Sequence, residues 1–296
     1  MTSRLADPKL LMATKNLSLA AKTTVDGFMA GIHNSNVKGM GMEFSQYRSY
    51  GAGDDLRLLD WKMFARSDKY FIRESQIETS ISVKIIIDAS ASMNHEDNGF
   101  TKIEYARYLA ASLAYLASMQ GDAIGLYVLQ NNNLFSLPSR RDHQHLQRLF
   151  YQLEQIHPAG QFTDAVHYKS LLSGNGIKEL LIFITDYYEE KGEITALLQS
   201  LSTGKHEIVV LHLLGENEME LQFEGYAALE DLETGRTIQI NTAAYRQEYK
   251  VKLCEHIERI RHHLLSRNIW YETITMNEPL DKALQQFLKG RNKIRR

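Results

Sequence analysis

The stretch IIIDASASM at residues 85–93 decides how this 296-residue chain is interpreted. Its three isoleucines predict a short buried strand, and Asp88 stands where that strand ends. Two serines, Ser90 and Ser92, follow at alternate positions. Ligands of doubly wound sheets bind beyond the carboxyl ends of the strands. We therefore expect three hard oxygen donors on one loop at that edge of a sheet.

A second apolar stretch, LIFITD at residues 181–186, has the same design, because it too is a predicted buried strand that ends in an aspartate. If the two strands are neighbours where the strand order reverses, Asp88 and Asp186 face one pocket. Between them in the sequence, Thr163 offers another hydroxyl in a loop. Carboxylate and hydroxyl oxygens suit Mg²⁺ or Mn²⁺. The alternative is a metal-free pocket, in which Asp88 and the serines only satisfy backbone groups of a turn.

Buried strands and helices alternate along the chain from residue 83 onward. The helix over residues 103–119 is apolar on almost every side, and Thr101 and Glu104 form a capping-box pattern at its start. This alternation predicts an α/β fold with a doubly wound, mostly parallel sheet and helices on both faces. The expected strands are 83–87, 123–129, 134–137, 180–185, 208–214 and 269–275, and the other expected helices are 142–156, 193–202, 243–267 and 280–289.

Two regions depart from this alternation. Residues 31–56 are rich in Gly, Asn and Ser, which indicates loops and turns. Residues 221–241 carry apolar residues on both sides of an ETGR turn at 233–236, which predicts a β-hairpin insertion. We therefore expect an N-terminal segment over residues 1–80 and a main domain over residues 81–290 that contains the hairpin.

The composition excludes several classes of protein. With 34 Lys and Arg against 36 Asp and Glu, the formal charge is −2, which argues against a dedicated nucleic-acid binder. Apolar residues make up 44% of the chain, as in ordinary globular proteins. A single cysteine, Cys254, excludes an intrachain disulfide and a multi-cysteine zinc site. No run of about 18 apolar residues is present, so we expect a cytoplasmic protein without a membrane span.

The oxygen-rich loops resemble the metal-ion-dependent adhesion site of von Willebrand factor type A domains. By this resemblance, the serines and the threonine bind Mg²⁺ or Mn²⁺ directly, and the aspartates bind it directly or through water. The resemblance also implies an open coordination position that takes a carboxylate from a partner protein. The implied metal ligands are Asp88, Ser90, Ser92, Thr163 and Asp186.

The stretch before the first strand carries a second resemblance. The segments GMEFSQYRSYGAGDDLR at residues 41–57, Asp60-Trp61 and Ala65-Arg66 resemble the signature of the domain-of-unknown-function 58 family. That family couples this block to a von Willebrand factor type A-like domain, and its genes are frequently neighbours of MoxR-type AAA+ ATPases. The resemblance covers about residues 31–288 and implies an α/β fold of that type with such an ATPase as partner. The segment Glu43 to Arg66 is either a structural clasp with internally paired charges or an interface.

Function is inferred from this resemblance and from the enzyme motifs that are missing. The sequence has no G-x-x-x-x-G-K-[ST], G-x-S-x-G or H-E-x-x-H, and no G-x-G-x-x-G after a strand. We therefore expect no enzyme but a metal-dependent protein-binding module, an adaptor or co-chaperone that works with a MoxR-type AAA+ ATPase on client proteins. The alternative is a metal-dependent hydrolase of phosphoesters, which uses Asp88 and Asp186 for Mg²⁺ and His95, Glu96 or Asp97 as its base.

Overall fold

The structure is a computed structural model, and it divides the chain into two compact units. One unit combines Met1–Gly31 with Ile81–Arg296, and the other is Ile32–Ser80. The N-terminal segment that we expected over residues 1–80 is thus split, because its first helices group with the larger unit. The described residues are 7–34, 46–51, 63–64, 66, 69–74, 81–130, 133–162, 168, 179–204, 206–221 and 226–294.

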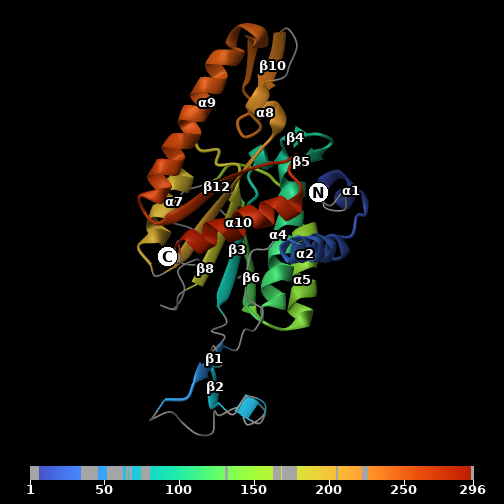
Figure 1. Cartoon of the computed structure of the whole chain (residues 1–296). Coiled ribbons are helices and arrows are strands. Elements are labelled where there is room, and N and C mark those ends of the chain that lie inside the picture. Colours follow the sequence, from blue (N-terminus) through green and yellow to red (C-terminus); the bar gives the residue numbers. More distant parts are fainter. Residues whose placement is uncertain are drawn as a thin grey trace. The chain divides into compact units, whose positions relative to one another are not determined.

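A six-stranded sheet with the order β12-β9-β8-β3-β6-β7 forms the centre of the larger unit (Figure 1). Every neighbouring pair is parallel except β6 and β7. The chain runs outward from β3 to β7 and then returns to the other side of β3 to build β8, β9 and β12, so the order reverses between β3 and β8. The strands are Ser82–Asp88 (β3), Ala123–Gln130 (β6), Asn133–Arg140 (β7), Glu179–Thr185 (β8), Glu207–Leu214 (β9) and Ile269–Thr275 (β12).

Helices cover both faces of this sheet, as predicted (Figure 1). On one face, α7 and α9 pack onto alternate strand residues such as Ile86, Phe183 and Val210. On the other face lie α4, α5 and α10, with α1 against α4. The helices are Pro8–Ala13 (α1), Leu17–Asn34 (α2), Lys102–Met119 (α4), His143–Glu154 (α5), Glu193–Ser202 (α7), Thr242–Leu265 (α9) and Leu280–Ile294 (α10). The predicted α/β fold with a doubly wound, mostly parallel sheet and helices on both faces is confirmed.

The helix α4 is the core helix of the fold, and its start is fixed by the predicted capping box. The Thr101 hydroxyl accepts a hydrogen bond from the Glu104 N–H at 3.3 Å, and the Glu104 carboxylate accepts one from the Thr101 N–H at 2.8 Å. These bonds satisfy two of the N–H groups that every helix leaves open at its start. The cap thereby sets the position of Lys102, the first residue of α4.

The segment between β9 and α9 forms the predicted hairpin. Tyr226–Glu230 (β10) pairs antiparallel with Thr237–Asn241 (β11). The structure adds a short helix before it, Glu216–Glu220 (α8), which the sequence analysis did not predict. Around the loop after β3 it adds a 3-10 helix, Ala91–Asn94, and two short paired strands, Glu96–Asp97 (β4) and Phe100–Thr101 (β5).

The smaller unit contains an antiparallel pair of strands, Gln46–Ser49 (β1) and Phe71–Glu74 (β2). The rings of Phe64 and Tyr70 stack with centroids 4.5 Å apart. Most of the segment Glu43 to Arg66, including Trp61, lies outside the described residues, so its role as clasp or interface stays open. Within the described parts of both units, no helix is both long and apolar enough to cross a bilayer.

Candidate functional site

The carboxyl ends of β3 and β8 form the candidate site, because the strand order reverses between them. Asp88 ends β3 and is fully buried. Its Oδ1 accepts a hydrogen bond from the Ser90 N–H at 3.0 Å, and its Oδ2 accepts one from the Thr185 hydroxyl at 2.7 Å. The Asp88 carboxylate is therefore held by its own loop and by the last residue of the neighbouring strand.

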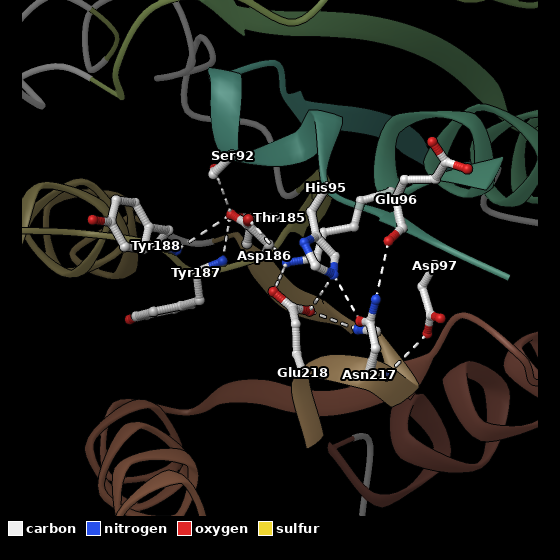
Figure 2. A network of polar contacts seen from close by, with 12 residues as sticks. Ser92, His95, Glu96, Asp97, Thr185, Asp186, Tyr187, Tyr188, Asn217 and Glu218 are labelled. Carbon is white, nitrogen blue, oxygen red and sulfur yellow. Dashed lines mark hydrogen bonds and ion pairs between the residues drawn. The ribbon is translucent and has the colours of Figure 1, made fainter. Parts of the chain in front are cut away.

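The two serines connect Asp88 to Asp186, the residue that follows β8. The hydroxyls of Ser90 and Ser92 lie 2.9 Å apart, and both side chains are buried. Ser92 also donates a hydrogen bond to Asp186 Oδ1 at 3.1 Å (Figure 2). The structure thus brings four of the five predicted residues together.

The fifth predicted ligand, Thr163, lies outside the described residues. The loop that precedes it runs beside the serine loop: the Ala91 N–H donates to the Gly160 carbonyl at 2.8 Å, and the Ala159 N–H donates to the Ala89 carbonyl at 3.0 Å. These bonds fix residues 159–160 next to the turn that carries Ser90.

A buried lysine, which the sequence analysis missed, also reaches this site. Lys102 Nζ lies 3.2 Å from Asp186 Oδ2 and 2.7 Å from Glu218 Oε1 on α8. Burial alone would lower the pKa of Lys102, but the charges of Asp186 and Glu218 outweigh it and raise that pKa. Lys102 is therefore an ammonium ion bound at the site. At the first turn of a helix, it carries no sequence signal that separates it from a surface lysine.

The loop that carries the possible catalytic bases contacts α8, through the side chains of His95 and Asp97 and the backbone of Glu96 (Figure 2). Asp97 Oδ2 accepts hydrogen bonds from the N–H groups of Glu216 and Asn217, at 2.5 and 3.2 Å, and so caps the start of α8. His95 Nε2 lies 2.8 Å from Asn217 Oδ1. The carbonyl oxygen of Glu96 accepts a hydrogen bond from the side-chain amide of Asn217. These contacts tie the loop after β3 to α8.

Negative charge accumulates at the site. Burial and, after it, the charge of Asp186 raise the pKa of Asp88 from 3.8 to about 7. Glu233, at the turn of the β10–β11 hairpin, also belongs to the site, although the sequence analysis did not name it as a site residue. Burial and the charges of Asp88 and Asp186 raise its pKa from 4.5 to about 7, while its contacts with Ser90 and Ser92 lower it.

The donors at this edge fit a hard divalent cation. Two aspartate carboxylates and two serine hydroxyls converge, all through oxygen, which is the ligand type that Mg²⁺ and Mn²⁺ prefer. Across the described part of the chain, no group of three or more His, Cys, Asp or Glu side chains is placed to hold a metal ion. The candidate site would therefore depend on its two hydroxyls, and its metal ligands stay a prediction.

Comparison with known sequences identifies one family and several uncharacterized relatives. The family described as "Protein of unknown function DUF58" matches residues 46–259. The uncharacterized protein Rv1480 of Mycobacterium tuberculosis is 29% identical over 235 residues, which cover 77% of this chain and 73% of the relative. The uncharacterized protein Mb1516 of Mycobacterium bovis matches to the same extent.

Two solved structures with a similar arrangement of strands and helices are a bacterial hypothetical protein and a VWA domain. The conserved hypothetical protein BatB from Bacteroides thetaiotaomicron is 18% identical, with a TM-score of 0.47 over 73% of this chain and 98% of that one. The SpRpn10 VWA domain is 12% identical, with a TM-score of 0.41 over 70% of this chain and 95% of that one. At these identities the likeness concerns the fold alone.

Proposed function

Because the chain belongs to the DUF58 family, whose function is unknown, we propose a function from its site: it is a protein-binding module that holds Mg²⁺ or Mn²⁺ at the carboxyl ends of β3 and β8. The observation that carries this proposal is the convergence of Asp88, Ser90, Ser92 and Asp186 at the point where the strand order reverses. A bound cation would supply a Lewis-acid position for an acidic side chain of the partner.

The charges of the described residues support a cation at this place. Lys102 is shared between Asp186 and Glu218, so one ammonium faces two carboxylates. Asp88 adds a further buried carboxyl whose pKa is raised by Asp186. Uncompensated buried charge costs free energy, and a divalent cation would relieve that cost. Perturbed carboxyl groups of this kind concentrate at functional sites.

The partners in this proposal come from the family resemblance. They are a MoxR-type AAA+ ATPase and a client protein that offers an Asp or Glu to the cation, with assembly or remodelling of the client as the outcome. We also propose a cytoplasmic location, with which a chain of a single cysteine is compatible because it needs no intrachain disulfide.

Binding is favoured over hydrolysis because the side chains of two of the three candidate bases, His95 and Asp97, are engaged with α8. A metal-dependent hydrolase needs a general base next to the metal-bound water. The carboxylate of Asp97 caps α8, and His95 contacts Asn217. The module therefore acts by binding, and we expect no turnover of phosphoesters above a Mn²⁺-only blank.

Calorimetric titration with Mn²⁺ and capture from native lysate test the proposal together. Ser92→Ala removes one oxygen donor, and we expect it to weaken Mn²⁺ binding by about tenfold or more. Ser112→Ala is the matched control, because this buried serine donates to the Tyr108 carbonyl within α4 and lies outside the site. The wild type and Ser112→Ala should capture the same ATPase with Mg²⁺ and lose it with chelator.

Two results would contradict the proposal. One is Mn²⁺ binding that is equal in the wild type and Ser92→Ala, with circular dichroism showing that both are folded. The other is reproducible phosphoester hydrolysis that disappears in Asp88→Ala.

A further inference from the structure

The turn of the β10–β11 hairpin has a fixed shape that presents Glu233. Asp231 directly follows β10, and its Oδ1 accepts hydrogen bonds from the N–H groups of Glu233 at 2.9 Å and Thr234 at 3.4 Å. Its Oδ2 accepts one from the Thr234 hydroxyl. Gly235 takes a positive φ of 70°, which a residue with a side chain rarely adopts. The backbone at Glu233 is thus held in place by its own turn.

Tyr188 ties this turn to the candidate metal site. Its hydroxyl donates a hydrogen bond to Asp231 Oδ2 at 3.0 Å. Its N–H donates one to Asp186 Oδ1 at 3.3 Å, which Figure 2 shows. A single residue therefore contacts both a candidate metal ligand and the hairpin turn. The hairpin is a described part of the same compact unit as β3 and β8.

The Glu233 side chain lies at the site without a full set of partners. Its Oε1 is buried and accepts no hydrogen bond. The groups that face it are the Ser90 and Ser92 hydroxyls and the charges of Asp88 and Asp186. A buried carboxylate oxygen without a partner costs free energy. Within the described residues, neither Asp88 nor Glu233 forms an ion pair with Lys or Arg. A cation among these oxygens would supply the partner that Glu233 Oε1 lacks.

We propose that Glu233 is an internal acidic ligand of this site, which occupies the position that the partner's Asp or Glu would take. This inference rests on the proposed function. A partner must then displace the hairpin turn before its own carboxylate reaches the cation. Because Glu233 is tethered to the site, it competes as an intramolecular ligand, which lowers the apparent affinity for any partner until the turn opens.

Trypsin cleavage after Arg236 reports on the turn directly, since Arg236 is exposed two residues after Thr234. In the wild type, saturating Mn²⁺ should hold Glu233 and slow cleavage at this bond by about fivefold or more, because cleavage requires local opening. Glu233→Gln should still bind Mn²⁺, about tenfold more weakly, and its cleavage should no longer respond to Mn²⁺. Glu230→Gln, an exposed neighbour on β10, is the matched control and should behave as the wild type.

A second variant tests the tether. Tyr188→Phe removes the hydrogen bond to Asp231 and keeps the backbone contact with Asp186. We expect cleavage after Arg236 to become faster in the absence of metal while calorimetry still detects Mn²⁺ binding. Cleavage at the wild-type rate would contradict a tether through Tyr188.

The outcomes separate this inference from the proposed function. If Mn²⁺ binds the wild type but cleavage after Arg236 does not change, or slows equally in Glu233→Gln, the internal ligand is overturned and the metal site stands. If calorimetry detects no Mn²⁺ binding to the folded wild type, the proposed function fails, and the internal ligand fails with it.

Discussion

The two ends of the central sheet bury charged side chains in different ways. At the amino ends of β3 and β8, Lys84 Nζ lies 2.7 Å from Glu179 Oε2, and the Ser82 hydroxyl donates a hydrogen bond to Glu179 Oε1. At the carboxyl ends of the same strands stand Asp88 and, just after β8, Asp186. One end thus pairs a lysine directly with a glutamate, and the other brings two aspartates together.

The difference lies in the balance of charge. The Lys84 ammonium pairs with the Glu179 carboxylate on the adjacent strand, and His206 Nδ1 lies 3.6 Å from the same Glu179 oxygen. One carboxylate with its own ammonium is the arrangement expected of a structural ion pair. At the other end, Lys102 serves both Asp186 and Glu218, and the pKa of Asp88 is raised to about 7. Burial is similar at both ends, so burial alone does not mark a site. The excess of carboxylates over cations at the carboxyl end is the reason why we propose a cation there and not at the amino end.

The largest loss of unfolding free energy is expected from breaking the Lys84–Glu179 pair. Lys84→Met keeps most of the side-chain volume but leaves Glu179 buried without its ammonium, so the free energy of unfolding should fall by about 3–5 kcal/mol. Urea denaturation measures this loss. Calorimetry should show Mn²⁺ binding unchanged, because the pair lies at the opposite end of the sheet. A loss under about 1 kcal/mol would mean that the two ends do not differ as argued.

A pH series sharpens the comparison at the carboxyl end. The pKa of Asp88 is raised in the folded protein, so folding favours its protonated form; this contribution is fully present below about pH 4 and is lost as pH rises through about 7. The difference in unfolding free energy between the metal-free wild type and Asp88→Asn should therefore change by roughly 3 kcal/mol over this range. Saturating Mn²⁺ should abolish the wild-type loss. If the difference in unfolding free energy between the wild type and Asp88→Asn did not change with pH, the pKa of Asp88 would not be raised in the folded protein.

A smaller loss of unfolding free energy is expected from replacing Lys102, the lysine at the carboxyl end of the sheet. Lys102→Met removes the ammonium from Asp186 and Glu218, and the metal-free protein should lose about 2 kcal/mol of unfolding free energy. The same variant should bind Mn²⁺ about tenfold more tightly, since the cation no longer competes with Lys102 for Asp186. Denaturation with and without Mn²⁺ and calorimetry measure both effects. Weaker Mn²⁺ binding would indicate that Lys102 supports the metal site.

The sheet could be predicted from the sequence, and so could four of the candidate metal ligands: Asp88, Ser90, Ser92 and Asp186. Short β-branched runs that end in Asp88 and Asp186 identify buried parallel strands, and strand–helix alternation sets their order. The edge strand β7 runs longer than predicted, to Arg140, and includes Pro138, which an edge strand tolerates because its N–H need not be paired. Such local sequence patterns predict the strands well because each buried strand is formed by one short apolar run.

The charged partners of the site were not predictable in this way. Lys102 and Glu218 are far apart in the sequence and meet only because α4 and α8 start at the same end of the sheet. Glu233 was visible as part of a turn, but its approach to Ser90 and Ser92 brings together the hairpin turn and the loop after β3, which are far apart in the sequence. Contacts between residues so far apart in the sequence produce no local pattern of residue types or spacings from which they could be predicted.

The central claim is that the carboxyl ends of β3 and β8 hold a divalent cation. Anomalous diffraction from crystals grown with Mn²⁺ tests it most directly. The account predicts one strong Mn²⁺ peak in contact with the oxygens of Ser90 and Ser92 and next to Asp88 and Asp186. A peak elsewhere, or an empty site at saturating Mn²⁺ with Lys102 still bound to Asp186, would contradict it.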